Sequence, residues 1–152
     1  MFRRTTRHSP FWAAAALLAL LAATHTLLAQ DAPTVRGELL RLINQHRKDN
    51  GKGPLSMDAS LTKAAQDHTD WMKATGTFSH TGKNGSSFSD RIEAAGGRPQ
   101  SASAENIADN SSAQAVFTAW KNSAGHNRNM LGPYSKVGIG YNGRYFTAVF
   151  TD

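Results

Sequence analysis

Residues 136–151 read KVGIGYNGRYFTAVFT, and this stretch decides the fold class. Within 137–141, large apolar side chains alternate with glycines, which is the period of two expected for a β-strand. The Asn-Gly pair at 142–143 is a strong signal for a type I′ turn. The return segment, 144–151, is rich in aromatic and β-branched residues. The stretch therefore predicts an antiparallel hairpin.

Four helices are predicted ahead of this hairpin, and a short strand is expected at 105–107. Each helix is indicated by apolar periodicity together with residues that typically start or stop a helix. The first is expected from Pro33 to the glycines after residue 50, and the second from Ser56 or Asp58 to Gly76. The third is expected from Ser87 or Ser89 to Ala95, and the fourth from Ser111-Ser112 through Trp120. Residues 81–87 are expected to form a loop. Because helices precede the hairpin without βαβ alternation, the fold class is α+β rather than a doubly wound sheet.

The large aromatic residues are expected to pack the helices against the sheet. They are Trp71, Trp120, Tyr145, Phe146 and Phe150.

The first 29 residues have the pattern of a secretory signal peptide. A basic head at 1–10 is followed by an uncharged apolar run at 11–23 and then by polar residues. Cleavage is expected after Ala29, which leaves a single domain at 30–152 outside the cell or in the periplasm, with no further segment that inserts into a membrane. The alternative is an uncleaved anchor, because residues 11–29 approach the ~20 that a spanning helix needs.

Composition excludes several classes of protein. The 17 Lys and Arg residues exceed the 11 Asp and Glu residues, but three of the arginines lie in the predicted signal peptide, so 14 against 11 leaves a net charge of +3. No basic cluster follows residue 29, and a nucleic-acid partner is therefore not expected. The absence of cysteine excludes disulfides, a thiol nucleophile and cysteine-ligated metals.

Two of the histidines stand out from the rest by their position in the chain. His80 and His126 are predicted at the ends of elements, where side chains reach clefts more often than cores. His46 and His68 instead fall on apolar helical stripes and are expected to be structural. A third candidate is Glu105, a carboxylate in a segment of small residues with no helix-surface role.

Two imidazoles and one carboxylate could hold a divalent cation with positions left open for water or ligand. They could equally bind an anion through protonated histidine or form a structural hydrogen-bond network. The spacings between the three residues match no short metal motif, and the common nucleotide, zinc-protease and serine-hydrolase signatures are absent.

Seven pieces of the sequence, in order, resemble the CAP superfamily of cysteine-rich secretory, antigen 5 and pathogenesis-related 1 proteins, also called the SCP domain, in its cysteine-free bacterial branch. The pieces are Asn44-x-x-Arg47, Pro54-Leu55, Leu61-x-x-Ala64-Ala65-x-x-His68, Phe78-Ser79-His80, Ala104-Glu105-Asn106-Ile107-Ala108, Trp120-x-x-Ser123-x-Gly125-His126-x-x-Asn129-Met130-Leu131 and Val137-Gly138-Ile139-Gly140. The resemblance runs from about residue 35 to the end.

The resemblance implies a three-layer α-β-α sandwich with a small antiparallel sheet between helices, and a cleft where the histidines meet acidic residues. On that basis His80, Glu105 and His126 are the expected metal ligands, with zinc the first choice, while Asn106 and Ser123 are expected to support the cleft. The second acid that eukaryotic members carry after the tryptophan is missing here, where Lys121 follows Trp120.

Three functions are compatible with these residues. The first is a secreted, non-catalytic binding module whose cleft holds a divalent cation, a small ligand or a protein partner. The second is a hydrolase of peptides or cell-envelope polymers, with Glu105 as general base or His126 activating Ser123 or Ser79. The third is lipid or sterol binding, for which the candidate apolar residues are each expected to pack in the core instead: Phe78, Phe88, Ile92 and Phe117.

Overall fold

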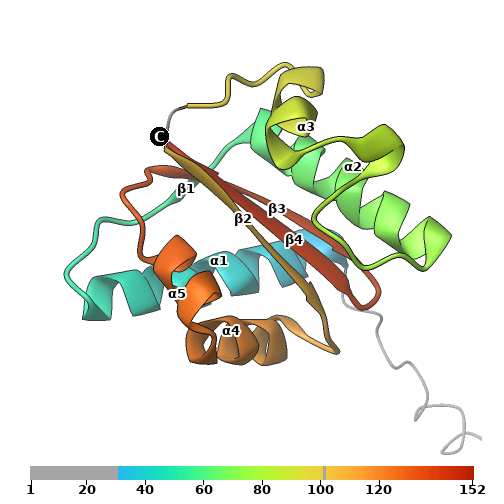
Figure 1. Cartoon of the computed structure of the whole chain (residues 1–152). Coiled ribbons are helices and arrows are strands. Elements are labelled where there is room, and N and C mark those ends of the chain that lie inside the picture. The colour runs from blue at the N-terminus through green and yellow to red at the C-terminus, as the bar shows by residue number, and fades with distance from the viewer. Residues whose placement is uncertain (1–30, 101) are drawn as a thin grey trace, which may run out of the picture.

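A four-stranded sheet lies between two layers of helices (Figure 1). The computed structural model describes residues 31–100 and 102–152; the predicted signal peptide at 1–29 lies outside the described residues. The elements in chain order are α1 (Ala32–Asp49), β1 (Ser56–Met57), α2 (Ala59–Thr75), the 3-10 turn η1 (Lys83–Gly85), α3 (Phe88–Ala94), β2 (Ser103–Asp109), α4 (Ala113–Asn122), α5 (Ala124–Met130), β3 (Lys136–Asn142) and β4 (Tyr145–Thr151). This architecture confirms the predicted α+β class.

The strand order is β1-β3-β4-β2, so the N-terminal and the middle strands flank the C-terminal hairpin. Strand β2 pairs antiparallel with β4, and Glu105 lies opposite Val149. The sheet, predicted to be antiparallel, is mixed, because the two-residue strand β1 pairs parallel with β3. Residue 56, considered above as a helix cap, belongs to this strand, and α2 is capped by Asp58.

The hairpin turn lies one residue further along than the sequence predicts. Asn142 pairs with Tyr145 as the last rung of the ladder, so the two loop residues are Gly143 and Arg144. Gly143 has a φ of +66°, and Arg144 is not among the residues with positive φ. A type I′ turn requires positive φ at both central positions, whereas type II′ requires it only at the first. The predicted type I′ turn is therefore wrong.

All four predicted helices are present, and side-chain caps fix where they begin. Asp31, Asp58, Ser87 and Ser112 each accept a hydrogen bond from a backbone N–H of the first turn. Helix α5 and the η1 turn within the expected loop were not predicted. The α4 helix ends before Ser123, which is extended, and α5 begins directly after it, so His126 lies within a helix and not after one.

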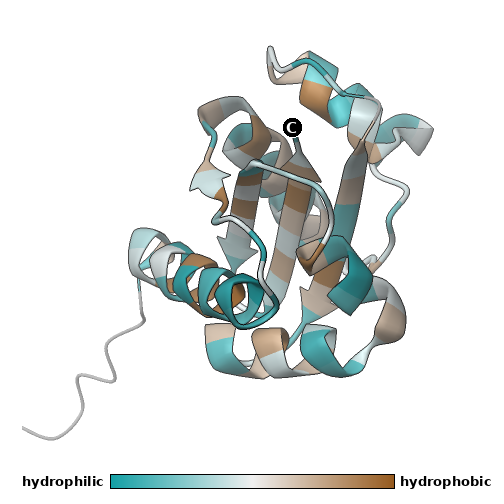
Figure 2. Cartoon of the chain, turned by 90° about the vertical axis from the view of Figure 1, so that its left-hand side faces the viewer, coloured by the Kyte–Doolittle hydropathy of each residue, from teal (hydrophilic) through white to brown (hydrophobic). Residues whose placement is uncertain are grey.

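Apolar side chains form a core on each face of the sheet. One core joins α1, α4 and the sheet, and it contains Trp120, Phe146 and Phe150, as predicted. The other joins α2 and α3 to the sheet around Val149. Figure 2 shows hydrophobic residues along the central strands, with hydrophilic and hydrophobic bands alternating on the surrounding helices.

Three aromatic residues lie outside these cores, contrary to expectation. Trp71 and Tyr145 are only partly buried, and Phe78 is 51% exposed. Of the remaining candidates for an apolar groove, Ile92 is fully buried and Phe88 packs against the core that contains it, while Phe117 packs against the other core. Within the described residues, no helix combines the length and the apolar character required to cross a membrane.

Helix α2 lies in direct contact with the backbone of β3 at two glycines. A Cβ added to Gly138 would overlap the backbone of Leu61 and Thr62, and one added to Gly140 would overlap the carbonyl group of Ala65. Neither glycine has a positive φ, so both are required for space and not for conformation. The Gly-x-Gly pattern of β3 thus sets the distance between the sheet and α2.

The same substitution is expected to have opposite effects at two glycines. Gly140→Ala forces α2 away from the sheet and should lower the free energy of unfolding by about 3 kcal/mol or more. Gly37→Ala, at an α1 position with no atom within 4 Å of the new Cβ, should raise it by about 0.5–1 kcal/mol. Urea denaturation of both variants tests this, and equal stability of the two would contradict the proposed contact.

Candidate functional site

His80 follows α2 and reaches over the free edge of the sheet toward β2. Its Nδ1 is 2.9 Å from Glu105 Oε1. An ionised carboxylate can only accept, so Nδ1 carries the proton and donates it to this hydrogen bond. The ring is thereby fixed in one tautomer, with Nε2 pointing away from the carboxylate. The side chain of His80 is 56% exposed.

Glu105 is buried behind His80, with only 1% of its side chain exposed. Its second oxygen, Oε2, accepts a hydrogen bond from Arg91 Nη2 at 2.6 Å. Arg91 belongs to α3 and also donates to the carbonyl groups of Ser86, at 2.8 Å, and His80, at 3.2 Å. The buried carboxylate is therefore matched by a guanidinium on one side and an imidazole on the other, which satisfies the requirement that a buried charge be paired.

His126 lies on α5 and lines the same pocket as His80. This pocket has a volume of about 490 Å³ and is lined by Phe78, Ser79, His80, Thr81, Ile107 and His126. Burial lowers the pKa of His126, and the nearby His80 lowers it further. Its imidazole is consequently neutral at neutral pH, and its ring faces Trp120 with 6.3 Å between the ring centroids. We call this pocket the cleft.

Asn106 joins β2 to the helix that carries His126. Because side chains alternate along a strand, Glu105 and Asn106 point to opposite faces of the sheet. Asn106 Nδ2 donates to the carbonyl of His126 at 3.1 Å, and its Oδ1 accepts from Asn129 at 2.9 Å. The two adjacent residues of β2 thus hold the two histidines of the cleft, one from each side of the sheet.

Ser123 occupies the N-cap position of α5, but its side chain makes no capping hydrogen bond. Its backbone N–H instead bonds to the carbonyl of Trp120 at 3.2 Å. Among the described residues, no hydrogen bond joins the Ser123 hydroxyl to His126. Ser79 Oγ accepts from the backbone of Thr81 at 3.0 Å, so this serine stabilises its own loop.

The two histidines expected to be structural are buried and hydrogen-bonded. His46 Nε2 lies 2.7 Å from Asn127 Oδ1, and its ring contacts the edge of Phe117. His68, on α2, donates from Nε2 to the carbonyl of Ser79 at 2.9 Å. This bond ties the loop that carries His80 to α2. Burial lowers the pKa of His68, and the charge of Arg91 contributes in the same direction.

The cleft contains two imidazoles, with the carboxylate of Glu105 behind that of His80. Within the described part of the chain, no group of three His, Asp or Glu side chains is placed to hold a metal ion. Both oxygens of Glu105 are hydrogen-bonded, one of them to a guanidinium. A carboxylate in this position orients a ligating histidine, as is common around metals. His80 and His126 line one pocket, while both oxygens of Glu105 are already engaged, and the predicted zinc site stays a prediction.

Arg91 was not found by reasoning from motifs, because its partner Glu105 lies 14 residues away on another element. One signal was present. A carboxylate in a strand of small residues needs a cation if the strand is buried, and few basic residues lie close before it in the chain. Arg91 and Arg98 are the two that immediately precede Glu105.

The family model for CAP, the cysteine-rich secretory protein family, matches residues 40–150. The chain belongs to the CAP family. It is 32% identical over 120 residues to the uncharacterized protein YkwD of Bacillus subtilis, a match that covers 78% of this chain and 46% of YkwD. This CAP chain spans less than half the length of the curated relatives it matches.

Two solved structures show that other bacterial proteins share the fold. An extracellular protein with an SCP domain from Bacillus anthracis superimposes with a TM-score of 0.73 at 27% identity, covering 78% of this CAP chain and 41% of that one. An outer surface protein of Borrelia burgdorferi gives a TM-score of 0.72 at 24% identity, covering 79% and 93%. The bacterial, cysteine-free form of the CAP fold is confirmed.

Removing the guanidinium beside Glu105 should destabilise this CAP domain. Arg91→Met leaves a buried carboxylate with one partner, which is expected to lower the free energy of unfolding by about 3–5 kcal/mol. The double variant Arg91→Met/Glu105→Gln removes the charge as well and should recover a substantial part of that loss. Denaturant unfolding measures both. A double variant less stable than Arg91→Met would contradict the buried pair.

His68 should make stability depend on pH below neutrality. Its folded-state pKa lies below the ordinary value of 6.5, so the unfolded chain takes up a proton first as the pH falls. The free energy of unfolding should therefore decrease as the pH falls through about 6.5 and level off below the folded-state pKa.

His68→Gln should flatten this part of the pH profile, measured by urea unfolding at a series of pH values. His46→Gln is the matched control at another buried histidine. The assignment fails if the profile of His68→Gln keeps the wild-type slope.

Proposed function

We propose that this CAP domain is an exported, non-catalytic binding module whose cleft takes a divalent cation or a small ligand. The observation that carries the proposal is the hydrogen bond from His80 Nδ1 to the buried Glu105, beside His126 in an open pocket. This bond supports binding because it holds an exposed ring in one orientation before any ligand arrives. A side chain fixed in advance loses less conformational entropy on binding.

The chemistry of the cleft suits a cation of the zinc class. Neutral imidazole is a good ligand for zinc and its neighbours in the first transition row. The lowered pKa of His126 keeps that ring neutral, and the tautomer of His80 leaves the Nε2 lone pair available. Such an ion would have two protein ligands, so water or part of a larger ligand would complete its coordination.

The rim of the cleft adds an apolar surface to these polar groups. Phe78 is 51% exposed and lies beside Tyr145, with 6.5 Å between the ring centroids. Ile107 contributes a further apolar side chain from β2. A ligand with one polar group for the imidazoles and an apolar or aromatic part for this rim therefore matches the cleft best.

The hydrolase alternative finds less support in the geometry. A general base needs an unengaged oxygen within reach of the substrate, but both oxygens of Glu105 are hydrogen-bonded and the side chain is buried. A serine nucleophile needs a base at its hydroxyl. In the described structure Ser123 Oγ has no such bond to His126, and Ser79 Oγ is engaged with Thr81.

Export is supported by two separate observations. The signal-peptide pattern of residues 1–29 indicates secretion. The similar SCP-domain protein of Bacillus anthracis is described as extracellular. Because this chain spans less than half of its curated relatives, the proposal concerns the domain and its cleft, and not the properties of those longer proteins.

Zinc titration of the purified protein by calorimetry at pH 7 tests the cation. Wild type should give a saturable isotherm, and His80→Ala and His126→Ala should each weaken binding at least about tenfold. Glu105→Gln should weaken it less, because the amide can keep the ring in place. Lys121→Ala, at an exposed residue of α4, is the control and should bind as wild type does. Superposable isotherms for wild type and both histidine variants would contradict the proposal.

A further inference from the structure

Three Asn-Gly pairs occur in the chain, at 50–51, 84–85 and 142–143. Each lies in a turn or at the end of an element, and none of the functions considered above makes use of them. An asparagine that precedes glycine can react with the backbone nitrogen of that glycine, because no side chain on the glycine hinders the approach. The structure restrains the three pairs to different degrees, and it therefore distinguishes which asparagine is free to react.

The reaction needs no partner other than water. The backbone nitrogen of the glycine forms a bond to Cγ of the asparagine, the bond from Cγ to Nδ2 breaks, and Nδ2 leaves as ammonia with the proton that the glycine gives up. Water then opens the five-membered imide at one of its two carbonyl groups. One product is aspartate. The other is isoaspartate, in which the main chain runs through the former side chain.

Asn50 and Asn142 are both held by their side-chain amides. Asn50, the C-cap of α1, donates from Nδ2 to the carbonyl of His46 at 2.8 Å. Asn142, at the end of β3, donates from Nδ2 to Asp70 Oδ1 at 2.8 Å, and its backbone pairs with that of Tyr145. Because Nδ2 is the atom that leaves, each side chain must first give up its hydrogen bond to reach the glycine nitrogen. The structure therefore opposes the reaction at both positions.

Asn84 lacks these restraints. It is exposed, and among the described residues no hydrogen bond holds its side-chain amide. It is also the only described residue other than glycine with a positive φ, at +58°, a conformation that asparagine tolerates better than most residues. Gly85 donates its N–H to the carbonyl of Gly82 at 3.1 Å, near the long end of the normal range. The attacking nitrogen is therefore freed by breaking one weak hydrogen bond.

We propose that Asn84 is a self-modification site, at which the backbone nitrogen of Gly85 converts the asparagine to isoaspartate and aspartate while Asn50 and Asn142 stay intact. Because ammonia is lost, the change does not reverse, and its extent increases with the age of each molecule. The reaction belongs to the turn η1 alone, so the proposal does not depend on the cation or ligand assigned to the cleft.

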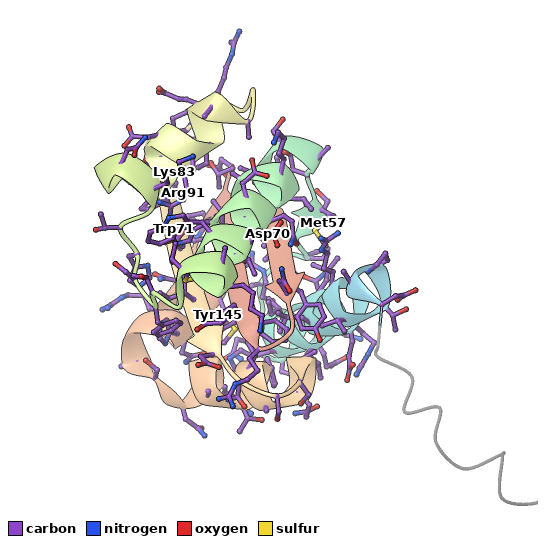
Figure 3. The ribbon with its side chains drawn as sticks, turned by 90° about the vertical axis from the view of Figure 1, so that its right-hand side faces the viewer. Met57, Asp70, Trp71, Lys83, Arg91 and Tyr145 are labelled. Carbon is purple, nitrogen blue, oxygen red and sulfur yellow. The ribbon has the colours of Figure 1, made fainter. Side chains whose placement is uncertain are left out.

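The loop that contains Asn84 is closed on itself and bonded to α3. The carbonyl of Ser86 accepts from the backbone of Gly82 at 2.8 Å and from Arg91 Nη1 at 2.8 Å. Figure 3 shows Lys83, directly before Asn84, close to Arg91. Isoaspartate adds one carbon atom to the main chain between Gly82 and Ser86. The loop therefore cannot keep both its closure and its present shape.

Isoaspartate in this loop should be detectable at the cleft. Arg91 holds Glu105 through Nη2, and Glu105 orients the ring of His80. A displaced Ser86 carbonyl weakens one of the hydrogen bonds that fix Arg91. The ring resonances of His80 should therefore shift in NMR spectra of the protein as Asn84 is converted.

The test is incubation of the purified protein at pH 8 and 37 °C, with peptide mapping by mass spectrometry and an isoaspartyl methyltransferase assay at intervals. The peptide that contains Asn84 should be converted at least about tenfold faster than those that contain Asn50 and Asn142. Asp70→Ala removes the bond that holds the Asn142 amide and should accelerate conversion there. Asn84→Gln is the control and should remove the signal at 84–85.

Each other outcome overturns the proposal. Conversion of Asn50 or Asn142 as fast as that of Asn84 would show that the side-chain hydrogen bonds do not decide reactivity. An unmodified Asn84, over a period in which a free peptide of residues 82–87 is converted, would show that the turn protects it. The link to the cleft is overturned if the His80 resonances stay unchanged in a converted sample, or if fresh Asn84→Asp shifts them equally, because that variant adds the charge without the extra carbon.

Discussion

Helix α2 rests on the backbone of β3 at Gly138 and Gly140, and this contact determines where the rest of the domain can lie. With no side chain between them, α2 presents Leu61, Ala64 and Ala65 directly to the sheet. The helix cannot rotate or rise without losing that contact, because backbone atoms do not yield as a flexible side chain would. The positions of the residues further along α2 are thereby fixed.

His68 links the fixed helix α2 to the loop that forms the cleft. One imidazole nitrogen holds the carbonyl of Ser79, and so sets the loop from which His80 extends. The other end of the arrangement comes from β2, the edge strand, where Glu105 is hydrogen-bonded to His80. The cleft therefore lies at the free edge of the sheet and is formed by the loop after α2, by strand β2 and by helix α5.

Local parts of the fold were predictable from sequence, and long-range pairings were not. The helix cap at Asp58 and the alternation of apolar residues and glycines in β3 can each be recognised from residues that are close in the chain. The parallel strand β1 depends on pairing with a strand near the other end of the chain, and two residues carry no periodicity. His80, Glu105 and His126 were found by position and resemblance, but the burial of Glu105 and its bond to Arg91 follow only from how α3 packs.

The burial of Glu105 decides what kind of chemistry the cleft presents. An exposed carboxylate would give the pocket a negative charge. The carboxylate of Glu105 is instead buried behind His80, and its charge is matched by Arg91. Its effect on the cleft is to hold the His80 ring in one orientation. The guanidinium has further partners, because Nη2 also donates to the carbonyl of His80 and Nη1 donates to the carbonyl of Ser86. One side chain therefore joins α3, the loop before it and β2, so a change at Arg91 reaches the carboxylate that orients His80.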